Sequence, residues 1–297
     1  MKKNIFLIFI VFTFHTIGFS QSFNQEKTQN NSSLLLGKIN KDALRKAPYS
    51  NWFIKNYNQY TPDSKVINAL KEQLPSYTIT AFMGTWCGDS KRETPRLYKI
   101  LEESQFPLDR LTLIAVARNG KAYKQSPGGE HEGLNIHRVP TIIIYKDGKE
   151  VNRIVESPVI SLEQDILHSI QGNYTPNHHL VTLANQLLED LGPEKFIKKS
   201  KSNIKEFKKY AHKTNQLNTY ANVLFLSDKK EEAIAILELN TLLYPKEAYV
   251  FSNLGNKLVK LNRFQEALGY YQQAQTLQPT NKKIQSMIAN VQENIKR

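Results

Sequence analysis

The sequence predicts two units, an α/β domain built on a central sheet and, after it, an all-α solenoid. As far as residue 172, short apolar and β-branched runs of strand length alternate with helical patterns. From residue 173 onward the strand patterns vanish, and apolar residues recur at the i, i+3, i+4 and i+7 spacing of helices. A chain of 297 residues with 40% hydrophobic content is long enough to bury two cores. We therefore expect the α/β domain in residues 34–172 and the solenoid in residues 173–297.

Residues 1–20 are organised like a secretory signal peptide. Two lysines precede an apolar run at residues 5–14, and small residues precede the expected cut after Ser20. The alternative is a membrane anchor, but the run is short for a membrane span and His15 interrupts it. We expect an exported protein, periplasmic or secreted, with no stable membrane span. Residues 21–33 are polar and lack periodicity, which predicts a disordered leader.

Residues 34–60 form an N-terminal extension with a short helical pattern and a cluster of aromatic residues, Tyr49, Trp52, Phe53, Tyr57 and Tyr60. Such a cluster suits a ligand platform, but packing of the extension against the domain is the commoner role, and we expect packing. Residues 61–63 (Thr-Pro-Asp) are typical of a helix start with proline at the first helical position, and they predict a helix to about Leu74.

A strand, a turn and a helix follow, and the turn holds the single cysteine. Residues 77–83 are β-branched and aromatic, which predicts a strand, and two glycines bracket Cys87. Asp89 and Ser90 are suited to cap the next helix, so Cys87 is expected at a helix N-terminus. The free amides there favour the thiolate, which is the nucleophilic form of cysteine.

Three further elements complete the α/β domain. Residues 111–117 (LTLIAVA) predict a strand buried on both faces, next to residues 77–83. Residues 118–132 are polar and glycine-rich and predict a loop that leads to a short helical turn. Residues 157–172 predict the last helix of the domain, ended by Gly172.

Two motifs in this domain resemble the thioredoxin family. Residues 86–91 read Trp-Cys-Gly-Asp-Ser-Lys where the family has Trp-Cys-Gly-Pro-Cys-Lys, and Pro95 falls where the family has a helix-kinking proline. Downstream, Val-Pro-Thr at 139–141 precedes IIIYKDGKEVNRIV, similar to the family's cis-proline, strand and hairpin. Two motifs in the correct order make a specific signal. The resemblance implies a thioredoxin-like fold with a mixed central sheet flanked by helices, and a site made of Cys87, Trp86, Ser90 and Pro140, listed here by their numbers in this chain.

The departures from the family pattern restrict the chemistry. Ser90 stands where the resolving cysteine belongs, Asp89 replaces the proline, and Ala81 replaces a buried acid. A dithiol cycle within one chain is therefore impossible, because only a thiolate exchanges with a disulfide at useful rates. The Ser90 hydroxyl is still able to hydrogen-bond the Cys87 sulfur. Arg138, two residues before the cis-proline position, is a candidate for lowering the Cys87 pKa, which Asp89 opposes; a solvated Arg138 is an equally good interpretation.

Charge and residue types limit which partners and cofactors are expected. The formal net charge of +13 favours acidic partners or anionic surfaces, but no nucleic-acid motif accompanies it and no nucleic-acid partner is predicted. One cysteine and scattered histidines lack zinc-ligand spacing, so no metal is expected, and no other cofactor is predicted. His131 and His137 have no partner carboxylate in a recognisable pattern and are interpreted as surface histidines.

The C-terminal half repeats with a period of 34 residues. This spacing separates equivalent pairs such as Pro245 and Pro279, or Ala233 and Ala267. The period and the residues Leu254, Gly255, Ala267, Tyr271, Ala274 and Pro279 resemble the tetratricopeptide repeat family. We expect clear repeats at 214–247 and 248–281 and a cap helix at 282–297. Helices at 178–191 and 193–213 would complete the stack in degenerate form.

Two functions are open on these grounds. In the first, an exported thioredoxin-like protein engages protein thiols or disulfides through Cys87 as a monothiol oxidoreductase or isomerase. An external thiol serves as donor, and the repeats recruit client proteins or peptides. In the second, the fold is a catalytically retired scaffold and the protein is an adaptor. Whether the chain is an enzyme is not decided by the sequence. A peroxiredoxin-like peroxidase is disfavoured because Thr85 lies two residues before Cys87 and that family's threonine lies three before its cysteine.

Overall fold

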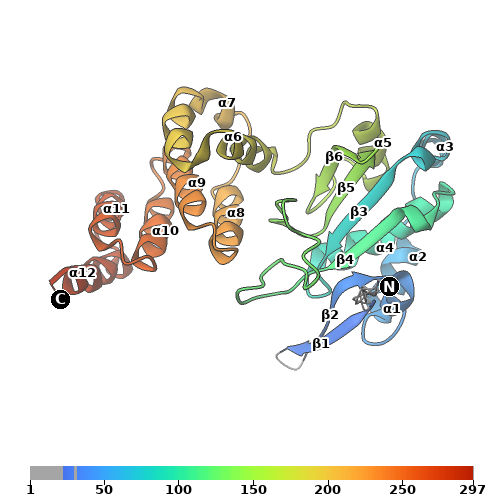
Figure 1. Cartoon of the computed structure of the whole chain (residues 1–297), viewed down its shortest axis with the longest axis horizontal. Helices are drawn as coiled ribbons and strands as arrows, with labels where there is room; N and C mark the ends of the chain where they lie inside the picture. The colour runs from blue at the N-terminus through green and yellow to red at the C-terminus, as the bar shows by residue number, and fades with distance from the viewer. Residues whose placement is uncertain (1–22, 30–31, 297) are drawn as a thin grey trace, which may run out of the picture.

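The computed structural model describes residues 23–29 and 32–296 (Figure 1). The signal peptide expected at residues 1–20 lies outside the described residues, as do four residues of the expected leader. The α/β part precedes a purely helical part, and the two lie side by side along the long axis of the molecule (Figure 1).

A six-stranded sheet in the order β1-β2-β4-β3-β5-β6 forms the centre of the α/β part. β3 and β4 pair in parallel, with Ala81 opposite Leu113, and the remaining pairings are antiparallel. The predicted mixed sheet, and the predicted pairing of its two apolar strands, are therefore confirmed. The strands are β1 (Gln25–Gln29), β2 (Ser32–Ile39), β3 (Thr78–Met83), β4 (Leu111–Ala115), β5 (Thr141–Lys146) and β6 (Lys149–Val155).

The first two strands correct the prediction of a disordered leader at residues 21–33. β1 pairs antiparallel with β2, and β2 pairs with the central strand β4. β2 buries Leu34, Leu35 and Ile39 against the domain, whereas β1 is an exposed edge strand. An edge strand exposed on its faces carries no apolar pattern and is held by backbone pairing, so its composition resembles that of a loop.

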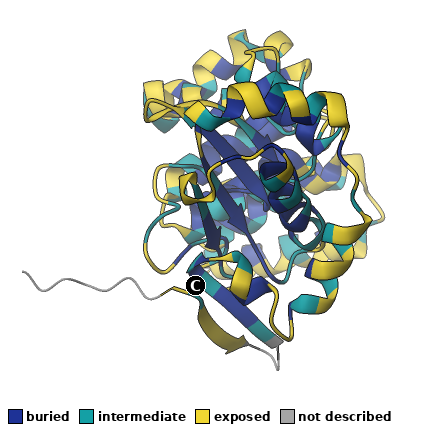
Figure 2. Ribbon diagram, turned by 90° about the vertical axis from the view of Figure 1, so that its right-hand side faces the viewer, coloured by how far each residue is buried: buried dark blue, intermediate teal, exposed yellow. Residues whose placement is uncertain are grey.

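Both faces of the central strands are buried (Figure 2). On one face, alternate residues of β3 such as Ile79 and Met83 join a core with helices α2 (Ser50–Gln59), α3 (Ser64–Gln73), α4 (Gly88–Glu103) and α5 (Leu162–Ile170). On the other face, Phe82 packs against residues of the long connection between β4 and β5. This arrangement explains why β3 and β4 are apolar at most positions.

The N-terminal extension packs against the domain as predicted. Phe53 of α2 is only 1% exposed, and its ring lies 5.9 Å from that of Tyr98 on α4. The short helix α1 (Lys41–Leu44) precedes α2. The predicted start of α3 is shifted by two residues: Asp63 is the N-cap, and its carboxylate accepts from two backbone N–H groups of the first turn, so Pro62 lies outside the helix.

The connection from β4 to β5 is a series of turns, and the short helical turn expected near its end is absent. Left-handed backbone conformations at Lys124, Gly129, Gly133 and Asn135 interrupt any helical run. This connection leads directly to the Val139–Pro140 peptide.

The helical part consists of α6 (His179–Ser202), α7 (Ile204–Lys208), α8 (Asn215–Leu226), α9 (Lys230–Leu243), α10 (Ala248–Val259), α11 (Phe264–Leu277) and α12 (Lys282–Lys296). The ranges expected for the two clear repeats each hold one helix pair, α8 with α9 and α10 with α11. Gly192 breaks α6 with φ 71° and ψ 167°, where the sequence predicted two helices. A separate core of buried residues from α6 to α12 joins the stack.

Candidate functional site

Cys87 is the N-cap residue of α4, which confirms its predicted position at a helix N-terminus. Its carbonyl accepts from Lys91 N–H at 3.0 Å, and its own N–H donates to Gly84 at 2.9 Å, closing the turn. The thiol is partly exposed. The helix start leaves its first amides without intrahelical partners, and the Cys87 side chain caps none of them.

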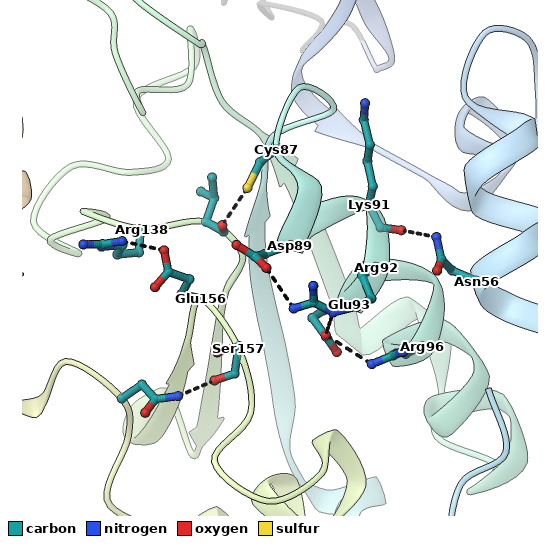
Figure 3. A network of polar contacts seen from close by, with 12 residues as sticks. Asn56, Cys87, Asp89, Lys91, Arg92, Glu93, Arg96, Arg138, Glu156 and Ser157 are labelled. Carbon is teal, nitrogen blue, oxygen red and sulfur yellow. Dashed lines mark hydrogen bonds and ion pairs between the residues drawn. The ribbon is translucent and has the colours of Figure 1, made fainter. Parts of the chain in front are cut away.

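The cis-proline segment lies against this thiol. The Val139–Pro140 peptide is cis, as the motif predicted. The Cys87 thiol donates to the Val139 carbonyl at 3.1 Å (Figure 3). The Pro140 carbonyl in turn accepts from Glu156 N–H at 2.7 Å. The fold therefore brings Cys87 and Pro140 together from two elements more than 50 residues apart.

Trp86 forms one wall of the site. Its indole Nε1 donates to the Val116 carbonyl at 3.0 Å at the end of β4, and its ring lies beside Tyr123. A Cβ placed on Gly84 would lie 2.6 Å from the Trp86 ring, so the close approach of ring and backbone requires glycine at position 84.

Ser90 was considered able to hydrogen-bond the Cys87 sulfur, but its hydroxyl has a different partner. The Ser90 side chain is completely buried, and its Oγ accepts from Gly84 N–H at 3.1 Å. The Cys87 thiol donates to Val139 instead. Ser90 thus fixes the turn, since it satisfies a backbone donor that would otherwise be buried without a partner.

The Asp89 carboxylate pairs with Arg92, which was not among the predicted site residues. Arg92 donates to Asp89 at 2.8 Å and to Glu93 at 2.5 Å (Figure 3). Glu93 is only 2% exposed and also accepts from Arg96. The i, i+3 spacing of Asp89 and Arg92 on a helix was a usable signal for the first pair.

Comparisons with known proteins agree with this geometry. The chain is 32% identical over 85 residues to mitochondrial thioredoxin-2 of Schizosaccharomyces pombe, and the aligned residues make up 29% of this chain and 56% of that relative. It is 30% identical over 96 residues to a thioredoxin of Chlamydia caviae, covering 31% of this chain and 82% of that relative. The chain belongs to the thioredoxin family. The tetratricopeptide repeat family model matches residues 248–281, so this family member carries a thioredoxin-like part fused to helical repeats.

In this thioredoxin-family chain, Arg138 pairs with a carboxylate and with a helix of the repeats. It forms an ion pair with Glu156 at 2.5 Å (Figure 3), and it donates to Thr219 of the repeat helix α8 at 3.2 Å. The Arg138 side chain is only 13% exposed, so it is not the solvated surface arginine of the second interpretation. Arg138 instead joins the cis-proline segment to the helical repeats.

Glu156 is the centre of this junction. Its second oxygen pairs with His178 at 2.8 Å, directly before α6. Burial alone would raise the pKa of Glu156, but the hydrogen bond from His178 and the charge of Arg138 outweigh burial and lower the pKa to about 2. Glu156 therefore remains an anion between two basic groups of different elements.

Two buried basic residues near the site had no sequence signal. Burial lowers the pKa of Lys124 to about 8, and its ammonium donates to the His137 carbonyl. His137 is also buried, contrary to its interpretation as a surface residue, and burial lowers its pKa to about 3. Its ring contacts those of His178 and Tyr220. Both residues lie in the glycine-rich connection, whose local composition does not reveal burial by a distant helix.

His131, also interpreted as a surface residue, is partly buried in the same connection, and its Nδ1 accepts from Ser126 N–H at 3.1 Å.

The described residues, 23–29 and 32–296, contain neither a metal-type cluster nor a helix suited to span a membrane. In that part of the chain no group of three or more histidine, cysteine or acidic side chains is arranged to hold a metal ion. Among the same described residues, no helix combines the length and apolar character needed to cross a membrane.

Proposed function

We propose that this protein is an exported monothiol thiol–disulfide oxidoreductase or isomerase that reacts with client proteins through Cys87. The observation that carries the proposal is the pairing of a partly exposed Cys87 at the start of α4 with a fully buried Ser90. The nucleophile is retained at a helix terminus beside the cis-proline segment, while no second thiol is available to displace a client.

The first step is attack on a client disulfide. The Cys87 thiolate attacks one sulfur, a Cys87–client S–S bond forms, the client S–S bond breaks, and the second client sulfur leaves as a thiolate. Trp86 and the Val139 carbonyl border the reacting sulfur and exclude part of the solvent around it. No net oxidation or reduction occurs in this step.

Release of the client then needs a thiolate from outside this chain. A second client thiolate that attacks the client sulfur forms a new client disulfide and returns Cys87 as a thiolate, which is isomerisation without net electron transfer. Alternatively, two molecules of a low-molecular-weight thiol displace the client and then regenerate Cys87, supplying two electrons and leaving as a disulfide. The helical repeats would recruit clients or partner proteins.

A trapping experiment tests the proposal. The wild-type protein, lacking a resolving thiol, should form long-lived mixed disulfides with exported proteins that carry disulfides, detected by non-reducing electrophoresis and mass spectrometry. Cys87→Ser is the blank, and added small thiol should release the clients. If the wild type traps nothing beyond this blank, and reacts with a small disulfide no faster than a free thiol does, the thiol chemistry is rejected in favour of the adaptor.

Export is a separate part of the proposal. The organisation of residues 1–20 supports cleavage near residue 20. The intact mass of the protein recovered from its native compartment measures the N-terminus. A mass that retains these residues would indicate an uncleaved anchor.

A further inference from the structure

We propose that a groove beside the active-site turn binds an acidic segment of the client, close to the client cysteine that Cys87 attacks. That the ligand is a client protein follows from the proposed function, on which this inference rests. The groove, called here the extension groove, has a volume of about 510 Å³, within the usual range for ligand sites. It lies between the N-terminal extension and the turn that carries Cys87, and its lining includes Tyr49, Trp52, Thr85, Trp86, Lys91 and Arg118.

The extension groove includes the residue that precedes Cys87 in the chain. Trp86 lines it and is bonded to Cys87, so the two Cα atoms are about 3.8 Å apart. The indole is fixed by its hydrogen bond to Val116 and by its contact with the Gly84 backbone. A peptide whose sulfur reaches Cys87 would therefore place a neighbouring residue in this groove.

The opposite wall comes from the N-terminal extension and is preformed. The rings of Tyr49 and Trp52 meet edge to face at 6.4 Å, and the Tyr49 hydroxyl donates to Glu26 of β1 at 2.8 Å. The backbone N–H of Leu35 on β2 donates to the Thr85 hydroxyl at 3.4 Å, which ties the hairpin to the active-site turn. A wall already ordered in the free protein reduces the entropy lost on binding.

The charge of the extension groove selects an acidic ligand. Lys91 on the first turn of α4 and Arg118 after β4 line it, and no carboxylate belongs to its lining. Among the ion pairs of the described residues, neither side chain has an acidic partner, whereas Arg92 and Arg138 are paired. In Figure 3 the Lys91 side chain extends away from the Asp89–Arg92 cluster. Ammonium and guanidinium groups without a partner recognise carboxylates by charge-assisted hydrogen bonds.

The aromatic wall favours a peptide over a lone anion. Three aromatic rings beside two cations offer apolar contact for the side chains of an extended segment as well as pairing for its carboxylates. We therefore commit to a client segment with Asp or Glu within a few residues of its cysteine.

The first test measures binding without thiol chemistry. Two matched peptides carry serine in place of the reactive cysteine, flanked in one by aspartates and in the other by asparagines, and are titrated by calorimetry against the full chain. We expect the acidic peptide to bind at least about tenfold more tightly, the equivalent of two partly exposed charge pairs. The double variant Lys91→Glu, Arg118→Glu should abolish this preference. A double variant Lys65→Glu, Lys71→Glu, at two exposed positions of α3, has the same net charge and should retain it.

The second test uses the same peptides with cysteine activated as a pyridyl disulfide. Attack by Cys87 forms the Cys87–peptide disulfide and releases thiopyridone, whose absorbance gives the rate, normalised to the rate with dipyridyl disulfide. A preference for the acidic peptide that is lost only in the groove variant supports the inference. Equal binding of both peptides overturns the inference. Equal loss of the preference in both double variants overturns it too, in favour of long-range attraction by the basic chain. Selective binding without any thiopyridone release would retain the groove and reject the thiol chemistry instead.

Discussion

At the scale of single residues, Ser90 shows why the missing second cysteine leaves the turn intact. Its side chain is fully buried and its Oγ accepts from the Gly84 N–H, so the hydroxyl has a defined structural partner. A thiol is a weaker acceptor than a hydroxyl. The position therefore suits serine in the folded state, even though a family member with two cysteines would have its resolving thiol there.

Ser90→Cys should convert the protein to a dithiol form. We expect an internal disulfide between positions 87 and 90, detected as a loss of two hydrogens in the intact mass, and much shorter-lived mixed disulfides with clients. The weaker acceptor at Gly84 N–H should lower the free energy of unfolding of the reduced protein by about 1 kcal/mol. Ser90→Ala is the control: it loses the hydrogen bond and gains no thiol, so client trapping should persist. An S90C protein that traps clients for as long as the wild type would show that residue 90 cannot reach the mixed disulfide.

At the scale of elements, the repeat helices depend on small residues at their crossing points. Gly255 of α10 lies under Tyr271 of α11, and a Cβ at Gly255 would be 2.5 Å from the Tyr271 ring. Tyr271 is 2% exposed and its hydroxyl donates to Asn256, so the ring has little freedom to move. Close packing of the helix pair thus requires glycine at position 255.

Gly255→Ala should lower the free energy of unfolding of the repeat part by about 1–3 kcal/mol, the usual effect of overpacking a core. Gly269→Ala on α11 is the matched control, because a Cβ there meets no atom within 4 Å. It should stabilise the protein by about 0.5–1 kcal/mol through helix propensity. Urea unfolding followed by circular dichroism at 222 nm measures both; a destabilised G269A or an unchanged G255A would contradict the packing argument.

The elements that could be predicted are those with local signals. β3, β4 and the paired repeat helices follow from apolar period and spacing, and the position of Cys87 follows from the glycine-bracketed turn before α4. β1 could not be predicted, because an edge strand stabilised by backbone pairing has no apolar pattern. The role of Arg138 and the burial of His137 depend on α8, more than 75 residues later in the chain. Neither the role of Arg138 nor the burial of His137 can be read from the neighbouring residues in the sequence.

At the scale of the whole molecule, Glu156 links the two parts. It forms ion pairs with Arg138 of the cis-proline segment and with His178 before α6. Arg138 in turn donates a hydrogen bond to Thr219 on α8. The folded pKa of Glu156, about 2, lies below its ordinary value of 4.5. The unfolded chain thus binds a proton at higher pH than the folded one. This contribution to stability is therefore complete above about pH 4.5 and is lost as the pH falls towards 2.

Glu156→Gln should lower the free energy of unfolding at pH 7 by about 1–3 kcal/mol, discounted for the partial exposure of the carboxylate. The difference from wild type should shrink as the pH falls from 4.5 to 2, since protonation removes the same charge. Urea unfolding at a series of pH values gives this difference. Glu150→Gln, which removes a surface partner of Arg153, is the control and should change stability by less than about 1 kcal/mol. A difference for E156Q that stays constant with pH would exclude the ionic origin of the effect.

The two outer strands of the sheet bear on how the protein behaves at high concentration. β1 (QEKTQ) and β6 (KEVNRIV) are the edges of the six-stranded order, and both carry charged side chains of either sign. The unpaired N–H and C=O groups of an exposed edge strand are able to pair with a strand of another chain. Charged residues on the edge oppose such pairing, because they would lose their hydration. The hairpin of β1 and β2 also covers the edge of β4, whose LTLIA sequence would otherwise present an apolar edge. Deletion of β1 and β2 should therefore increase the tendency of the protein to form intermolecular β-structure, measured by light scattering and infrared spectroscopy against the full chain.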